Sequence, residues 1–327
     1  MHSSPKISVI IPAHNCGKSL AKAIKSIPND SRIEIIIVEN GSTDNTPVVA
    51  KQLTSDRNNV SIIQSPLGVS AARNEGIVAS RGQKIMFLDA DDYFLPNLTE
   101  FLKKLVPSDL DIFSFESGSS IKNMFTVREQ FSGNELTNLI SKMLTFPTDY
   151  LTVWGKVFDG QIIRDHHLLF PTDLRLSEDS YFMINYLSYC QRVTGHSTLL
   201  YHYSRNNDST VRTFNKQTII DYTKSLMAVK VLVERRLPFL LHDYYKYGLM
   251  QLNLIGVHGI FNPQNIDGFF MKTTMLKKVI HQKIFAECLE KVPFSELGSI
   301  KFIAIILIKL HLFFGAGLVF VARSVRS

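Results

Sequence analysis

Two carboxylates, Asp89 and Asp91, directly follow an apolar run in the stretch KIMFLDADD. Carboxylate oxygens are ligands that a hard divalent cation prefers, and diphosphate oxygens and waters can complete its octahedron. A cation held in this way neutralises the charge that develops on a departing nucleotide. A pair of this spacing is more often a solvated turn, so its place in the fold must decide between the two interpretations.

A second pair with the same spacing, Asp109 and Asp111, stands before an apolar run instead of after one. In sheets of parallel strands, ligands bind beyond the carboxyl ends of the strands. We therefore expect Asp89 and Asp91 to lie at a site, and Asp109 and Asp111 to lie away from it.

The stretch LSEDSYF carries two adjacent acids, Glu178 and Asp179. Acids in the first turn of a helix are stabilised by the helix dipole, which requires no role in a reaction. A carboxylate can instead act as a general base, because an acceptor hydroxyl is a poor nucleophile until its proton is taken. Both interpretations stay open from these residues alone.

Polar residues follow the first two apolar runs, in PAHNCGKSL and VENGSTDNT. Turn chemistry and helix capping explain such residues as well as a binding role does. In the binding role, Glu39 accepts a hydrogen bond from a pyrimidine N–H or a ribose hydroxyl. The first loop lacks the glycine patterns of dinucleotide-binding and P-loop enzymes, so neither class is indicated.

Two arginines stand in polar stretches, Arg73 in GVSAARNEGI and Arg205 in YHYSRNNDST. A guanidinium offers a planar fork of donors that suits phosphate oxygens, so both are candidates for contact with a diphosphate. A solvated surface arginine is the alternative for Arg73. A strand and turn at a domain edge is the alternative for residues 201–210.

Short runs rich in Ile and Val alternate with helical patterns in the first third of the chain. The expected strands cover residues 7–11, 33–38, 60–63, 84–88 and 111–115, and the expected helices lie near 17–27, 44–55, 69–80 and 97–105. Such runs indicate strands buried on both faces. The alternation predicts a parallel α/β sheet with right-handed crossovers, whose carboxyl edge gathers the polar residues described above.

The rest of the chain changes character twice. Residues 116–215 look irregular and hold Trp154, the single tryptophan. Beyond them, apolar residues recur at three- and four-residue spacing near 216–236, 242–260 and 268–290, which indicates helices. We expect a first domain over residues 1–215 and a helical region over 216–327.

The net charge of +7 lies mainly in the tail. Residues 1–100 hold ten basic and ten acidic side chains, whereas residues 271–327 hold nine against three. A nucleic-acid binder would carry its basic excess across a folded face, while a basic apolar tail suits an anionic membrane surface. Three scattered cysteines indicate neither a disulfide framework nor a zinc site and favour a reduced, cytoplasmic compartment.

The segment 302–322 is apolar except for Lys309 and His311. Its length suits a spanning helix, but Lys309 near the middle costs roughly 2.5–3.5 kcal/mol on insertion scales. A helix lying in the membrane interface is the second interpretation, and a buried or self-associating helix is the third. In the interfacial case, the side chains that reach headgroups are Lys301, Lys309, Arg323 and Arg326. We expect a membrane-associating segment at about 300–323.

The chain resembles the family 2 glycosyltransferases of bacterial surface-polysaccharide pathways in six motifs taken in order: IPAHN, VENGSTD, GVSAARNEGI, FLDADD, SEDSYF and YHYSRNNDST. The resemblance covers residues 5–210 and implies a GT-A fold, in which a Rossmann-like nucleotide half joins an acceptor half. It implies metal-dependent transfer of one sugar from a nucleotide-diphosphate donor, a UDP-sugar by expectation, with inversion by single displacement. The expected acceptor is a glycan or a lipid-linked molecule at the inner face of the cell membrane. The chain could also form a homo-oligomer, and it is not expected to bind nucleic acid.

The resemblance also implies roles for residues of this chain. Asp91 would ligate Mg²⁺ or Mn²⁺, and Asp89 would contact the ribose or a metal-bound water. Asp179 would be the catalytic base with Glu178 beside it, and Trp154, in VWGK, would stack on an acceptor sugar. The expected donor-binding residues are Pro12, Ala13, Asn15, Glu39, Ser42, Arg73, Asp89, Ala90 and Arg205.

Two departures from the family pattern bear on these expectations. Glu39 and Asn40 stand where the family usually has two aspartates, which bears on the donor base. No QxxRW motif follows Asp179, so addition of one sugar per encounter is favoured over processive synthesis. Two other functions are weighed: a degenerate nucleotide-sugar-binding module anchored at a membrane, and a nucleotidyltransferase, which would need a glycine-rich loop after the first strand.

Overall fold

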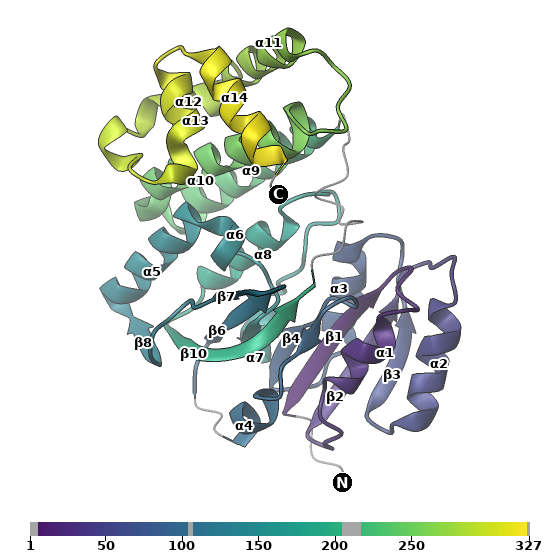
Figure 1. Cartoon of the computed structure of the whole chain (residues 1–327). Coiled ribbons are helices and arrows are strands. Elements are labelled where there is room, and N and C mark those ends of the chain that lie inside the picture. The colour runs from purple at the N-terminus through teal and green to yellow at the C-terminus, as the bar shows by residue number, and fades with distance from the viewer. Residues whose placement is uncertain (1–5, 104–106, 205–216, 326–327) are drawn as a thin grey trace. The chain divides into compact units, whose positions relative to one another are not determined.

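The computed structural model of the chain describes residues 6–103, 107–204 and 217–325 (Figure 1). The chain forms two compact units. The first comprises Met1–Leu139, Thr152–Thr172 and Asn185–Arg205, and the second comprises Ile140–Leu151, Asp173–Ile184 and Asn206–Ser327. The second unit thus holds the predicted helical region and, in addition, two segments from within residues 1–215.

The first unit is built on a mixed sheet, which has ten strands in the described part of the chain. Eight of them follow the order β3-β2-β1-β4-β9-β6-β10-β5, while β7 pairs with β6 and β8 pairs with β10. The strands are β1 (Ile7–Ala13), β2 (Ile33–Glu39), β3 (Val60–Gln64), β4 (Lys84–Phe87), β5 (Tyr93–Phe94), β6 (Leu110–Ser117), β7 (Ser120–Lys122), β8 (Glu129–Ser132), β9 (Lys156–Asp159) and β10 (Arg192–Tyr203).

Strands β1 to β4 are parallel, as the alternating pattern predicts. Every residue of β1 except Pro12 is buried, which fits an apolar strand covered on both faces. The prediction of a parallel sheet is wrong beyond β4, because β9 lies antiparallel between β4 and β6. Four residues carry too little periodicity for this strand to be recognised in the sequence.

The prediction that residues 116–215 are irregular is also wrong. They contain β7 to β10 and four helices: α5 (Gly133–Thr145), α6 (Pro147–Tyr150), α7 (Gly160–Asp165) and α8 (Glu178–Leu187). Strand β10 is the longest of the described strands, yet its register on β6 shifts between His196 and Leu199 and again before Tyr201. These irregularities break the alternation by which a strand is recognised.

The predicted helices of the first unit are present as α1 (Leu20–Lys25), α2 (Thr46–Asp56), α3 (Val69–Ala79) and α4 (Leu98–Lys103). Helix α3 lies close against the sheet because Gly76 has no side chain. A Cβ at Gly76 would come within 2.3 Å of Ile10 Cγ2 on β1. This close approach places Arg73 of the same helix next to the strand ends.

The second unit is helical, as predicted from residue 216 onward (Figure 1). After α6 and the start of α8, its described elements are α9 (Thr218–Arg236), η1 (Pro238–Leu240), α10 (Leu241–Leu254), η2 (Ile255–Ile260), α11 (Phe269–Ile280), α12 (Lys283–Lys291), η3 (Phe294–Glu296), η4 (Ile300–Phe302), α13 (Ile303–Lys309) and α14 (Phe313–Ser324).

The apolar segment 302–322 is not one helix. It divides into α13 and α14, joined through His311, whose φ of 60° ends the first helical run. Among the described residues, no helix combines the length and the apolar character needed to cross a bilayer.

Three basic residues of the apolar tail segment, Lys301, Lys309 and Arg323, contact other residues of the second unit. Lys309 does not reach out to headgroups, because its ammonium donates to the carbonyls of Leu289 and Val292 at the end of α12. Lys301 is 3.1 Å from Asp149, and Arg323 donates to Asn253 Oδ1 at 3.3 Å and to the Lys301 carbonyl. Arg326 lies outside the described residues.

Candidate functional site

The ends of three neighbouring strands bring the predicted donor residues to one edge of the sheet. Ala13 at the end of β1 lies opposite Glu39 at the end of β2, and β4 ends beside β1 just before Asp89. Backbone hydrogen bonds continue past these ends, from Asn40 to Ala13 at 2.9 Å and from Leu88 to Ile10 at 3.0 Å. This is the carboxyl edge, where ligands of such sheets bind.

The loops after β1 and β2 are locked together by Asn15. Its φ of 49° is left-handed, a conformation that asparagine tolerates better than most residues. Asn15 Oδ1 accepts the N–H of Thr43 at 2.8 Å, and the N–H of Asn15 donates to Ser42 Oγ at 3.1 Å. Asn15 thus has the turn role that was the alternative to donor binding, and the same bonds hold Ser42 at the edge of the sheet. Contact between Asn15 and the donor stays a prediction.

Glu39 is buried, and both of its carboxylate oxygens serve the turn that follows. Oε1 accepts the N–H of Ser42 at 2.6 Å, and Oε2 accepts the N–H of Gly41 at 3.3 Å. Burial raises the pKa of Glu39, but these hydrogen bonds and the nearby His14 outweigh burial, so the pKa lies below its ordinary value. Glu39 is therefore held ionised, with lone pairs left over for a ligand donor.

We expect the Glu39 carboxylate to make stability depend on pH in the acid range. A carboxyl group whose pKa is lowered by folding contributes stability above its unfolded pKa, about 4.3, and loses it as the pH falls through the folded pKa. At pH 7, Glu39→Gln should be less stable by about 1–3 kcal/mol, because one N–H loses its acceptor. The gap in thermal midpoint should narrow as the pH falls below the unfolded pKa; a gap that is constant with pH would contradict this.

Asn40, also buried, fixes the loop between β3 and α3. Its Nδ2 donates to Ser65 Oγ at 2.8 Å and to the carbonyl of Pro66, and its Oδ1 accepts the N–H of Gly68 at 2.9 Å. Gly68 has a φ of 123°, which favours glycine at this turn. An aspartate cannot donate to Ser65 or Pro66, so the amide in place of the family's usual aspartate has a structural reason.

We expect Asn40→Asp to destabilise the protein even though aspartate is usual in the family that the sequence resembles. The new carboxylate would lose the hydrogen bond to the carbonyl of Pro66 and face that oxygen in a buried position, while the Ser65 hydroxyl can turn to donate to it. The expected cost is about 1–3 kcal/mol, measured as a lower thermal midpoint. The exposed Asn123 gives a matched control, Asn123→Asp, which should change the midpoint little.

Arg73 is neither a solvated surface residue nor free to turn outward. It is buried, its Nη2 lies 3.2 Å from Asp89 Oδ1, and its guanidinium carbon lies 5.2 Å from the centre of the Phe170 ring. The alternative of a surface arginine is therefore wrong, because the aromatic ring and the carboxylate hold it at the strand ends. The side chain of Asp89 is 31% exposed.

A buried aspartate that the sequence analysis did not single out supports the Asp89–Asp91 turn. Asp92 accepts hydrogen bonds from Tyr201 Oη at 2.6 Å and from the N–H of Ser204 at 2.7 Å, and Tyr201 Oη also accepts the N–H of Asp89. Burial and the charge of Asp89 raise the pKa of Asp92 to about 8. The end of β10 is thereby tied to the acidic turn.

The acidic turn offers hard oxygen ligands at an accessible place. Asp91 is exposed, Asp89 is partly exposed, and Ala90 between them is buried. In the described part of the chain, no cluster of three or more His, Cys, Asp or Glu side chains could hold a metal by itself. Two carboxylates fit a cation that takes its other ligands from a bound diphosphate and water.

Trp154 is 8% exposed and belongs to an aromatic cluster. Its ring stacks on Tyr201 and Tyr203, with centroids 4.8 and 5.4 Å away, and meets Phe115 edge-on at 4.7 Å. The cluster secures β10, which carries Tyr201. Contact between Trp154 and an acceptor sugar stays a prediction.

Glu178 and Asp179 form the acidic first turn of α8, and both are partly exposed. They belong to the second unit, whereas the donor-side residues belong to the first. Ser177 just before them has a φ of 59° and donates to Gln251 Oε1 at 3.3 Å. Left-handed backbone at a non-glycine residue costs energy and is often found at functional sites. The conformation of Ser177 is therefore consistent with a functional role for the turn that precedes Asp179.

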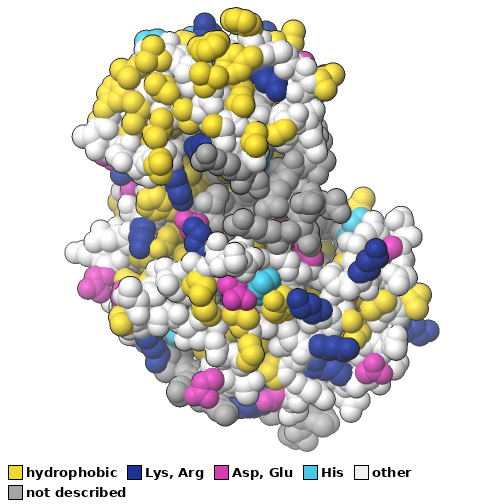
Figure 2. Space-filling view, viewed as in Figure 1, with side chains coloured by type: hydrophobic (Ala, Val, Ile, Leu, Met, Phe, Trp, Pro, Cys, Tyr) yellow, Lys and Arg dark blue, Asp and Glu magenta, His cyan; other side chains and the backbone are white. Residues whose placement is uncertain are grey.

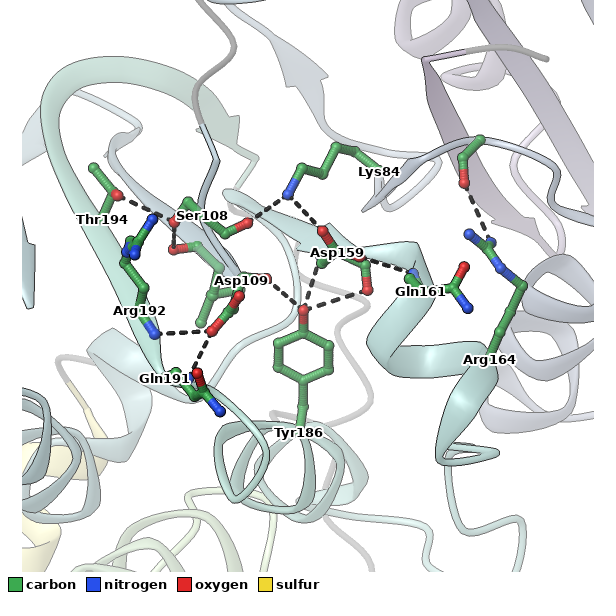
Figure 3. A network of polar contacts seen from close by, with 12 residues as sticks. Lys84, Ser108, Asp109, Asp159, Gln161, Arg164, Tyr186, Gln191, Arg192 and Thr194 are labelled. Carbon is green, nitrogen blue, oxygen red and sulfur yellow. Dashed lines mark hydrogen bonds and ion pairs between the residues drawn. The ribbon is translucent and has the colours of Figure 1, made fainter. Parts of the chain in front are cut away.

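The second aspartate pair lies at the start of β6, away from the carboxyl ends of β1, β2 and β4, and has a structural role. Asp109 Oδ2 accepts the N–H groups of Gln191 and Arg192 at the start of β10, at 2.6 and 2.8 Å. Asp111 is buried and lies 2.8 Å from His196 Nε2. Figure 3 shows that Tyr186 and the Lys84–Asp159 ion pair join the same network. Arg205 lies outside the described residues.

Comparison with known proteins gives one family. Residues 8–170 match the family described as glycosyl transferase family 2. Among curated proteins, the chain is similar to two Bacillus subtilis proteins named as glycosyltransferases, EpsH and EpsJ, with 27% identity over 224 residues and 30% over 218. These matches cover 65% and 63% of this chain and 65% and 62% of the two relatives, which is less than two thirds of their length.

Two solved structures share the fold. S. aureus TarS 1–349 in complex with UDP-GlcNAc has a TM-score of 0.69 at 16% identity, covering 97% of this chain and 90% of that one. The mannosyltransferase PcManGT from Pyrobaculum calidifontis, in complex with GDP-Man and Mn²⁺, has a TM-score of 0.51 at 13% identity, covering 98% and 88%. The predicted GT-A fold is thereby confirmed.

Proposed function

Because residues 8–170 belong to glycosyl transferase family 2, we propose that this chain is an inverting glycosyltransferase that moves one sugar from a UDP-sugar to an acceptor hydroxyl. The observation that carries the proposal is the carboxyl edge of β1, β2 and β4. It places a buried ionised Glu39, a Ser42 held by Asn15, and the exposed acidic turn at Asp89 and Asp91 on neighbouring strands.

On this proposal, the uridine lies against the ends of β1 and β2. Pro12 and Ala13 present backbone there, and Glu39 accepts a hydrogen bond from the base or the ribose. Arg73 holds Asp89 in place by their ion pair, so that Asp89 faces the ribose side of the donor. Loss of Arg73 would then weaken donor binding through Asp89, even where the guanidinium does not touch the donor.

We propose that Asp91, with Asp89 beside it, holds Mn²⁺ or Mg²⁺ together with the donor diphosphate. The carboxylates and their exposure fit such a hard cation, which would supply neutralisation of the charge on the departing diphosphate. The fold neighbour PcManGT was solved with Mn²⁺, which supports the assignment by analogy.

Asp179 is proposed as the general base. Its carboxylate takes the proton from the acceptor hydroxyl while that oxygen forms a bond to the anomeric carbon. The bond from this carbon to the diphosphate breaks in the same step, and UDP leaves with its electron pair. A single displacement of this kind inverts the anomeric configuration. The acceptor is proposed to be a glycan or lipid-linked molecule met at the inner face of the cell membrane.

The proposal is tested by calorimetric titration of the purified full chain with UDP, first with Mn²⁺ and then with chelator. Micromolar binding that collapses on chelation supports a metal-bridged nucleotide-diphosphate site. A folded sample that binds UDP in neither condition rejects the UDP-sugar assignment. A degenerate binding module gains no support from Asn40, because the buried amide has the structural role described above.

A further inference from the structure

Helix α14 carries apolar side chains on an exposed side as well as on its buried side. One side is buried in the second unit, through Ala316, Gly317, Phe320 and Ser324. The other side is exposed and consists of Phe314, Leu318, Val321 and Val325, which follow one another at intervals of four, three and four residues. This spacing makes a continuous stripe along the outer side of the helix. A surface helix ordinarily carries polar residues there.

The stripe continues onto the start of α11. The rings of Phe270 and Phe314 lie 6.3 Å apart, and the rings of Phe269 and Phe314 lie 4.8 Å apart. The two helices come this close because a Cβ at Gly317 would already be within 2.8 Å of Phe269 Cζ. Phe270 is 79% exposed, and Ile266, just before the helix, is 97% exposed.

We call this surface the apolar face and define it by Ile266, Phe270, Met271, Phe314, Leu318 and Val321. Figure 2 shows hydrophobic side chains gathered over the part of the chain that holds α11 to α14. Contiguous exposed apolar surface of this kind marks an interaction site, whereas single exposed apolar residues are ordinary.

The charges around the apolar face are mostly basic. Helix α11 carries Lys272, Lys277 and Lys278, of which Lys277 and Lys278 are exposed. Lys277 Nζ lies 5.0 Å from the centre of the Phe313 ring, at the start of α14. Asp267 is the acidic neighbour of Ile266. A second copy of the chain would oppose lysines with lysines, which disfavours pairing of this face with itself.

We propose that the apolar face binds an anionic phospholipid membrane, with its aromatic and aliphatic side chains in the interface and the α11 lysines at the headgroups. The apolar face replaces the single interfacial helix expected over residues 302–322 by a surface made from α11, α14 and Ile266, which lies three residues before α11. The inference deepens the proposed function, since it names the surface that would meet a lipid-linked acceptor. Binding to lipid requires neither donor nor acceptor, so a failure of the lipid-binding proposal can be told apart from a failure of the proposed transferase function.

The test is flotation of the full chain with vesicles of phosphatidylcholine and phosphatidylglycerol at 3:1. We expect the wild-type chain to float with these vesicles and to bind pure phosphatidylcholine at least about tenfold more weakly, because each lysine near an anionic surface adds roughly 1 kcal/mol. The variant Phe270→Asp/Leu318→Asp should lose at least about tenfold in binding. Val48→Asp is the matched control, since Val48 on α2 is similarly exposed but belongs to the first unit, and it should bind as wild type does.

A second variant, Lys277→Gln/Lys278→Gln, replaces exposed side chains and protects the test against misfolding of the first. It should lose affinity for the anionic vesicles and keep its weak affinity for neutral ones. The proposal is overturned if wild type does not float with anionic vesicles, or if both variants float as well as wild type. It is also overturned if sedimentation shows a dimer that Phe270→Asp/Leu318→Asp dissociates while vesicles stay unbound.

Discussion

Replacing Asp179 by Asn should lower the rate of sugar transfer by at least about a hundredfold while leaving UDP affinity within about a factor of two. General bases contribute about 10²–10⁴ to a rate, because the nucleophile must lose its proton as it attacks. The amide keeps the size of the carboxylate but cannot take a proton. On the proposed mechanism Asp179 contacts the acceptor hydroxyl and not the nucleotide, so UDP affinity has no reason to fall.

The assay for this prediction compares single-turnover transfer with calorimetric UDP affinity on the same preparation. Glu178→Gln is the matched control, since it removes the neighbouring charge from the same helix turn and should retain most of the activity. A well-folded Asp179→Asn protein that binds UDP poorly, or that transfers sugar at the wild-type rate, would contradict the assignment of the base.

Asp91→Ala should weaken UDP binding in Mn²⁺ by at least about tenfold and should make the remaining affinity insensitive to chelator. The reason is that, on the proposed function, Asp91 would hold the cation that neutralises the diphosphate, so its loss would remove the contribution of the metal. Little loss of folding stability is expected, because Asp91 is exposed. The measurement is titration of wild type and of Asp91→Ala with UDP, each in Mn²⁺ and in chelator.

The matched control is Asp56→Ala, which removes an exposed carboxylate at the end of α2 and should leave both affinities unchanged. If Asp91→Ala retains chelator-sensitive binding of wild-type strength, the metal site lies elsewhere. If Asp56→Ala weakens binding equally, the effect is one of net charge.

The structure adds a layer of residues that position the predicted ones. Asn40 holds the β3–α3 loop, Asn15 holds the turn at Ser42, and Asp92 ties the acidic turn to Tyr201. None of these contacts has a sequence signature, because each joins residues at least 25 positions apart. Their shared consequence is that the exposed carboxylates stand on a braced turn, which a binding site for a diphosphate needs.

The sequence by itself determined strands β1 to β4 and helices α1 to α4, the strand ends at which polar residues gather, and the difference between the two aspartate pairs. Those features are local, since apolar periodicity and the order of motifs along the chain carry them. Tertiary structure alone decided that β9 enters the sheet antiparallel, that Arg73 is buried against Asp89, and that Lys309 caps α12 instead of reaching a membrane. In each case the partner comes from a distant segment, and contacts between distant segments produce no periodic pattern of apolar residues in the sequence.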